Sequence, residues 1–187
     1  MAHADDAISA ENARLKARVK KLKKKLKAAR AAASAQQPGP AVSPLAPKSG
    51  YPDIPEIAGL RLSAVAAGVK YKGRDDVMLA ELAPGSVIAG VFTRSSTRSA
   101  PVLDCEAKLA ALPPVPEAGM AIIVNAGNSN AFTGHAGQAT VDDITGALAD
   151  LMDLPAPHVF SASTGVIGEP LPPGKITDAM VALRDGL

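Results

Sequence analysis

Apolar residues, together with one asparagine, recur every seven residues in the first part of the chain. They form two interleaved series: Ile8, Leu15 and Leu22, and Asn12, Val19 and Leu26. This is the heptad spacing of a coiled coil, in which one seam asparagine can fix the register. Ala, Lys and Arg fill most of the positions between, and no Gly or Pro interrupts them. We therefore expect a basic helix over 1–37.

The heptad pattern does not determine what this helix binds. A solvated Lys-rich helix without any partner is one interpretation, and weak self-association through residues 8–29 is another. Binding to nucleic acid or to an anionic membrane is the third; the segment has no interleaved aromatic residues, so any attraction to phosphate would be independent of nucleotide sequence. We expect no specific nucleic-acid partner and no membrane partner.

The next segment, residues 38–55, contains six prolines, which neither a helix interior nor a central strand accommodates. It is predicted to be a linker or an extended arm. Residues 56–187 then form the folded domain. Short apolar runs predict a hairpin from strands 60–69 and 77–82, a third strand at 86–93, a buried fourth at 121–125 and another at 158–163.

Two helices are predicted after the fourth strand. Residues 138–154 place apolar side chains at helical spacing, namely Val141, Ile144, Leu148 and Leu151. Residues 172–186 do the same with Ile176, Met180 and Leu183. Strands and helices thus share one domain of mixed α/β or α+β class, preceded by the basic helix, although periodicity alone does not give the order of the strands.

Composition narrows the class of protein. The 187 residues contain no apolar run near the roughly 18 residues that a membrane span needs. Cys105 is the only cysteine, which excludes an internal disulfide and a cysteine-rich metal site. The N-terminus has no apolar signal core, so we expect a cytoplasmic protein without a bound metal. The first 35 residues carry ten basic and three acidic side chains, whereas the rest is acidic, with ten against fifteen.

The loop at 125–137 is the first candidate for chemistry. It follows a buried strand, and Asn125, Asn128 and Asn130 offer amide groups that could contact a ligand. The spacing of its glycines matches neither a phosphate-binding loop nor a dinucleotide fingerprint. His135 is a candidate general base, but a loop histidine without a recognisable partner is more often a surface residue.

The second candidate is the segment 159–171, "VFSASTGVIGEPL", with three hydroxyls at Ser161, Ser163 and Thr164. An esterase elbow needs a glycine two residues before its serine, which "SASTG" lacks. The three histidines of the chain, His3, His135 and His158, give no recognisable base. The Thr164 hydroxyl and the backbone around Gly165 suit an oxyanion hole, and an ordinary Ser/Thr turn is the alternative.

Five segments in the same order resemble the ornithine acetyltransferase family, also called bifunctional glutamate N-acetyltransferase/acetylornithine acetyltransferase of arginine biosynthesis. They are "VSPLAPKSGYPDIPEIAGLRL", "AGVKYKGRDDVMLAEL", "AGVFTRSSTRSAPV", "IIVNAGNSNAFTGHAG" and "SASTGVIGEPL". The resemblance covers about Val42 to Leu187. It implies a layered αββα sandwich of the self-cleaving N-terminal-nucleophile type.

The same resemblance implies a reaction. In this family a precursor cuts itself before a threonine, which then takes the acetyl group of N-acetylornithine and passes it to glutamate. No cofactor is implied, apart from acetyl-CoA as a donor in bifunctional members. Two α and two β chains usually assemble, and the β chain carries the nucleophilic threonine.

Carried over by position, the Thr-Gly pair that stabilises the negative intermediate falls on Thr164 and Gly165, and no substrate-binding residue can be assigned. The family's cleavage site and nucleophile lie further along than Leu187, and Ala139-Thr140 lacks their flanking sequence. The chain thus resembles an incomplete α region, expected to be inactive alone. A non-catalytic truncated or fused interaction protein and a hydrolase like the β-aminopeptidases are the alternatives.

Overall fold

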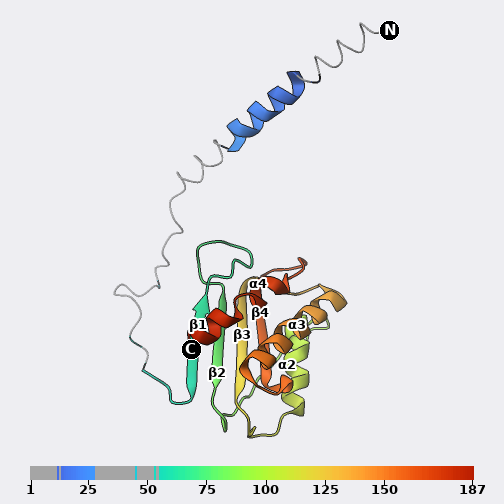
Figure 1. Cartoon of the computed structure of the whole chain (residues 1–187). Helices are drawn as coiled ribbons and strands as arrows, with labels where there is room; N and C mark the ends of the chain where they lie inside the picture. Colours follow the sequence, from blue (N-terminus) through green and yellow to red (C-terminus); the bar gives the residue numbers. More distant parts are fainter. Residues whose placement is uncertain (1–11, 13, 28–44, 46–52, 54) are drawn as a thin grey trace. The chain divides into compact units, whose positions relative to one another are not determined.

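The computed structural model describes residues 12, 14–27, 45, 53 and 55–187 (Figure 1). The chain divides into two compact units, Met1–Asp53 and Ile54–Leu187. Within the first unit, residues 12 and 14–27 are helical and all their side chains are exposed. The remainder of the predicted 1–37 helix lies outside the described residues, as does most of the predicted linker at 38–55. No described helix is long and apolar enough to cross a membrane.

The second unit is built on a four-stranded sheet with the order β1 (Leu60–Val65), β2 (Val77–Leu82), β3 (Met120–Asn128) and β4 (Val159–Val166). The first three strands are antiparallel, and β4 runs parallel to β3. The predicted hairpin is confirmed by the β1–β2 pairing, with a shorter first strand. The mixed α/β class is confirmed as well.

Three helices cover one face of this sheet, namely α3 (Gly134–Met152), α4 (Pro173–Thr177) and α5 (Met180–Asp185), and α2 (Ala100–Ala111) lies along β4 (Figure 1). A one-turn 3-10 helix, η1 (Ala156–His158), leads into β4. The apolar stripe predicted for 138–154 is largely buried in α3, against the inward side chains of the sheet. The predicted C-terminal helix is two short helices separated at Asp178–Ala179, and its three apolar residues are buried as expected.

The opposite face of the sheet is apolar and partly open. Cross-strand neighbours on this face include Ala64, Met78, Val124 and Ala162. Ala64 and Ala162 are exposed, and Met78 is 38% exposed. Leu62, in the adjacent row, is 57% exposed. Antiparallel and mixed sheets commonly bury an apolar face against a second layer. We call this surface the open sheet face.

The outer edge of β4 is covered by α2, a helix that the sequence did not predict. The Cys105 thiol donates to the Ser161 carbonyl at 3.3 Å, and Lys108 Nζ donates to the Val159 carbonyl at 2.8 Å. These bonds satisfy carbonyl groups that an edge strand otherwise leaves free. Burial raises the pKa of the Cys105 thiol, with Asp104 adding to that effect and the Ser161 bond and Lys108 opposing it.

The strand predicted at 86–93 is wrong, because this segment has no strand partner. Its Val87 and Val91 are 65% and 99% exposed. Near its middle, Gly90 lies so close to α2 that an added Cβ would be 3.1 Å from a Leu109 methyl group. A short apolar run forms a strand only where a sheet edge can pair with it, and α2 occupies the edge at β4.

Candidate functional site

The carboxyl ends of the parallel strands β3 and β4 meet at a backbone irregularity. Thr164 is opposite both Ala126 and Asn128, so the register shifts at Gly127/Asn128. Gly165 lies opposite Gly127, and both have positive φ, +136° and +106°. A Cβ on Gly165 would lie 2.3 Å from the carbonyl carbon of Gly127, closer than any real contact. The two strands approach so closely here because both positions are glycine.

The three hydroxyls proposed from the sequence have different surroundings. Ser161 is buried on the helix-covered face, and its Oγ has no hydrogen-bond partner. Ser163 is half-buried and donates to Asn125 Oδ1 at 2.6 Å. Thr164 lies on the open sheet face, as Ala162 does, since side chains two residues apart on a strand share a face. It is exposed, and among the described residues its hydroxyl has no partner. Thr164 alone is available to a ligand on that side.

The described histidines lie elsewhere. His158 comes immediately before β4, six residues and roughly 20 Å of strand from Thr164, and its Nδ1 is 3.0 Å from the Gly119 carbonyl oxygen. His135 is an exposed residue in the first turn of α3, and His3 is outside the described residues. The geometry therefore supplies no histidine base along β4. Both Thr164 and Gly165 lie within the strand, whereas the prediction ended the strand at Ser163.

The asparagines that the sequence offered as possible ligand contacts are buried. Asn125, Asn128 and Asn130 are at most 4% exposed. Asn125 Nδ2 donates to the Asn128 carbonyl at 2.8 Å, and Asn128 Nδ2 donates to the Glu169 carbonyl at 3.0 Å. The Asn128 Oδ1 accepts the backbone N–H of Asn130 at 2.7 Å. Because amides bind the backbone here, they fix the loop conformation and are not free for a substrate.

Asn130 ties the same loop to the start of α3. Its Nδ2 donates to the Gly137 carbonyl at 2.9 Å, and its Oδ1 accepts the Thr133 hydroxyl at 2.8 Å. Its φ of +46° is left-handed, a conformation that asparagine tolerates better than most residues. We call Asn125, Asn128 and Asn130 the asparagine clamp. It connects β3, the segment after β4 and α3.

The connection between β1 and β2 also reaches this site. Asp76 is buried, and its carboxylate accepts the backbone N–H groups of Ala67, Gly68 and Val69 at 2.8, 3.1 and 2.6 Å. The connection so fixed places Lys70 against β3, where an added Cβ on Gly127 would be 2.7 Å from the Lys70 Cβ. The predicted hairpin did not indicate this role of Asp76, because its three acceptor contacts depend on the folded loop.

Removing the side chain of Asn128 is expected to destabilise the domain. Asn128→Ala leaves the buried N–H of Asn130 and the Glu169 carbonyl without these partners, and each unsatisfied group costs about 1–3 kcal/mol. We expect the free energy of unfolding to fall by about 2–4 kcal/mol in urea denaturation. Asn12→Ala, the same change at an exposed helical position, is the control and should leave it unchanged. Equal stability of both variants would contradict the role of the clamp.

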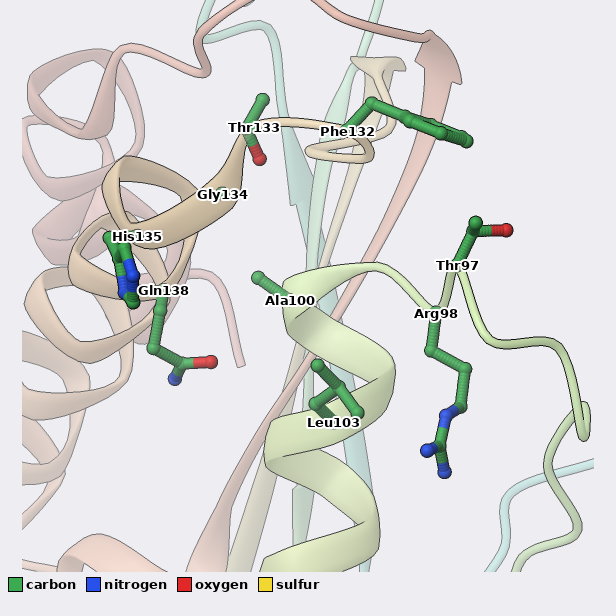
Figure 2. A pocket seen from close by; sticks show the side chains of 9 residues that line it. All are labelled: Thr97, Arg98, Ala100, Leu103, Phe132, Thr133, Gly134, His135 and Gln138. Carbon is green, nitrogen blue, oxygen red and sulfur yellow. The ribbon is translucent and has the colours of Figure 1, made fainter.

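A separate cavity of about 410 Å³ lies between the first turns of α2 and α3 (Figure 2). It is lined by Thr97, Arg98, Ala100, Leu103, Phe132, Thr133, Gly134, His135 and Gln138. Arg98 forms an ion pair with Glu106 at 2.7 Å. No group of three His, Cys, Asp or Glu side chains suited to a metal ion occurs among the described residues.

Comparison with known proteins identifies relatives. The ArgJ family model matches residues 61–187. The arginine biosynthesis bifunctional protein ArgJ of Ruegeria pomeroyi is 59% identical over 130 residues, which are 70% of this chain and 31% of that protein. The protein of the same name from Gluconobacter oxydans is 53% identical over 146 residues, 78% of this chain and 33% of that protein. The chain thus spans about a third of the length of these curated relatives.

Two solved structures share the fold. The crystal structure of the arginine biosynthesis bifunctional protein ArgJ from Bacillus halodurans is 31% identical, with a TM-score of 0.59, and the match covers 66% of this chain and 62% of that one. Ornithine acetyltransferase from Mycobacterium tuberculosis, in complex with ornithine, is 37% identical with a TM-score of 0.57, over 67% and 65% of the two chains. By the family match over most of its length, this chain belongs to the ArgJ family.

Proposed function

We propose that the chain forms part of an acetyltransferase that moves an acetyl group from N-acetylornithine to glutamate. In this proposal Thr164 and Gly165 supply the oxyanion hole. The observation that carries it is the exposed, unpartnered hydroxyl of Thr164 beside the close contact of Gly165 with Gly127. The membership of the ArgJ family and the bound ornithine of the Mycobacterium tuberculosis relative support the substrate class.

The proposed reaction has two acyl transfers. A threonine hydroxyl, outside this chain, adds to the acetyl carbonyl carbon of N-acetylornithine, and its proton passes to the N-terminal amine of the same threonine. The carbonyl oxygen becomes anionic and accepts a hydrogen bond from the Thr164 hydroxyl, aided by backbone around Gly165. Collapse breaks the C–N bond of the acetyl group: the departing nitrogen takes the proton from the N-terminal amine of the threonine, ornithine is released, and an acetyl ester remains on the attacking threonine. The amino group of glutamate then attacks this ester and gives a proton to the N-terminal amine. The second tetrahedral intermediate breaks its bond to the threonine oxygen, which takes that proton back, and N-acetylglutamate is released.

The open sheet face gives the attacking threonine a place to approach. This face carries Thr164 together with exposed apolar groups at Leu62 and Met78, which are 57% and 38% exposed. Two sheets that pack face to face lie about 10 Å apart and bury such side chains between them. We propose that the part of the enzyme with the nucleophile packs here, as the second layer of the sandwich, in an assembly of two α and two β chains.

The proposal predicts that residues 1–187 have no transferase activity alone. The chain should be purified by itself and also co-expressed with the remaining two thirds of an ArgJ relative. Formation of N-acetylglutamate from N-acetylornithine and glutamate is then measured in both. We expect product only from the combined protein, because only it contains an attacking threonine. Product formed by the isolated chain at a comparable rate would refute the proposed division of the site.

A further inference from the structure

We propose that the basic helix binds an acidic, heptad-patterned helix of another protein. The described part of this helix presents four apolar side chains in one row, each 47–58% exposed: Leu15, Val19, Leu22 and Leu26. Nothing in the described first unit covers them. Covering apolar side chains removes them from water, which favours association, so a partner that covers the row is stabilised by that burial.

The shape of this row favours a helical partner. At 100° per residue the four side chains fall within an arc of roughly 60°. Helices that pack on a domain or lie in a membrane surface usually have an apolar arc of about 100° or more, whereas a seam of two positions in seven is characteristic of a coiled coil. The segment also has no Trp, Phe or Tyr to anchor it in a lipid interface.

The charges that flank the row oppose pairing with a second copy. Lys16 and Lys23 follow the Leu15 and Leu22 seam positions, and Arg18 and Lys25 precede Val19 and Leu26. In a parallel pair of helices, the positions that follow Leu15 and Leu22 face the positions that precede Val19 and Leu26 of the other helix. In an antiparallel pair, each of these two sets faces the same set on the other helix. Because all four flanking residues are cationic, both arrangements of two copies place like charges opposite each other. Glutamates at the flanking positions of a partner would instead form attractive pairs at all four sites.

Charge and seam together specify the partner. Residues 14–27 contain nine Lys or Arg and no Asp or Glu. A nucleic acid would neutralise these cations but leave the apolar row exposed to water, since phosphate contacts need no apolar surface. An acidic heptad helix satisfies both features at once. The heptad spacing alone suggested a second copy, and the flanking charges redirect that prediction to a different chain.

The full chain should be titrated with a synthetic three-heptad helix that has Leu and Val in the seam and Glu at both flanking positions. Binding is measured by fluorescence anisotropy at about 150 mM salt, a concentration that screens weak surface charge pairs. We expect saturable binding, weakened at least tenfold by Leu22→Ser, which removes a seam contact, and at least tenfold by Lys16→Glu combined with Lys23→Glu. Val181→Ser, at an exposed apolar position of the second unit, is the control and should bind as the unaltered chain does.

Three results would overturn the proposal. The first is binding that Leu22→Ser does not change, because the seam would then play no part. The second is tighter binding to duplex DNA or to phosphatidylserine vesicles than to the acidic peptide, which would assign the helix to a polyanion or a membrane. The third is sedimentation of the chain alone as a dimer through residues 1–37, which would restore the second copy as partner.

Discussion

Gly165→Ala is expected to abolish acetyl transfer in the complete enzyme and to destabilise the isolated chain. The new Cβ would lie 2.3 Å from the Gly127 carbonyl carbon and 2.6 Å from the Asn128 nitrogen. These are backbone atoms of a paired strand, so no side-chain rotation relieves the contact. A φ of +136° adds strain for any residue with a Cβ. We expect the free energy of unfolding to fall by more than about 3 kcal/mol, within the large effects known for overpacked, strained positions.

Urea denaturation of the 187-residue chain checks this expectation. Gly146→Ala is the matched control, because an added Cβ at this position in α3 meets nothing within 4 Å. Alanine is the better helix former by about 1 kcal/mol, so the control should be equally or slightly more stable. Equal midpoints for Gly165→Ala and the unaltered chain would show that β3 and β4 do not approach as closely as described.

Thr164→Ala should slow catalysis without harming the fold. Thr164 is exposed and its hydroxyl has no partner among the described residues, so the truncation removes no hydrogen bond of the described domain. In the complete enzyme we expect kcat to fall by about 10²–10³, the usual effect of losing one oxyanion donor. The KM for N-acetylornithine should change little, because the donor acts on charge that develops only in the transition state.

Thr164→Ser separates the hydroxyl from the methyl group of the same side chain. Serine keeps a donor at the same position, so this variant should retain most of the activity. If Ser and Ala variants lose activity equally, the methyl group and its packing matter, and the hydrogen-bond role is wrong. If both remain fully active, Thr164 has no part in the reaction.

The sequence was sufficient to predict the elements whose apolar pattern matches their final environment. The stripe of α3 and the apolar run of β3 are buried in the structure, as their spacing indicated. Thr164 and Gly165 came from a motif and lie together at the carboxyl end of β4. The apolar spacing along the sequence predicts burial correctly where the burial of each residue follows from the helix or strand that contains it.

Features that depend on distant partners could not be predicted in this way. In α2 only Ala100 and Pro101 are fully buried, so the sequence has no apolar stripe from which this helix could be predicted. Segment 86–93 has the short apolar run of a strand but no sheet edge to pair with. The asparagine clamp was interpreted as a ligand-binding loop, because the same amides bind backbone or substrate equally well. Only the positions of Glu169 and Gly137 decide between these roles.

The most direct test of the oxyanion role is the rate of a single acetylation in the complete enzyme. N-acetylornithine is mixed with excess enzyme, and the acetyl ester on the attacking threonine is followed over time by mass spectrometry. For Thr164→Ala we expect this rate to be about 10²–10³ times lower than for the unaltered enzyme, with Thr164→Ser close to the unaltered rate. An unchanged rate of acetylation in Thr164→Ala would contradict the assignment of Thr164 to the oxyanion hole.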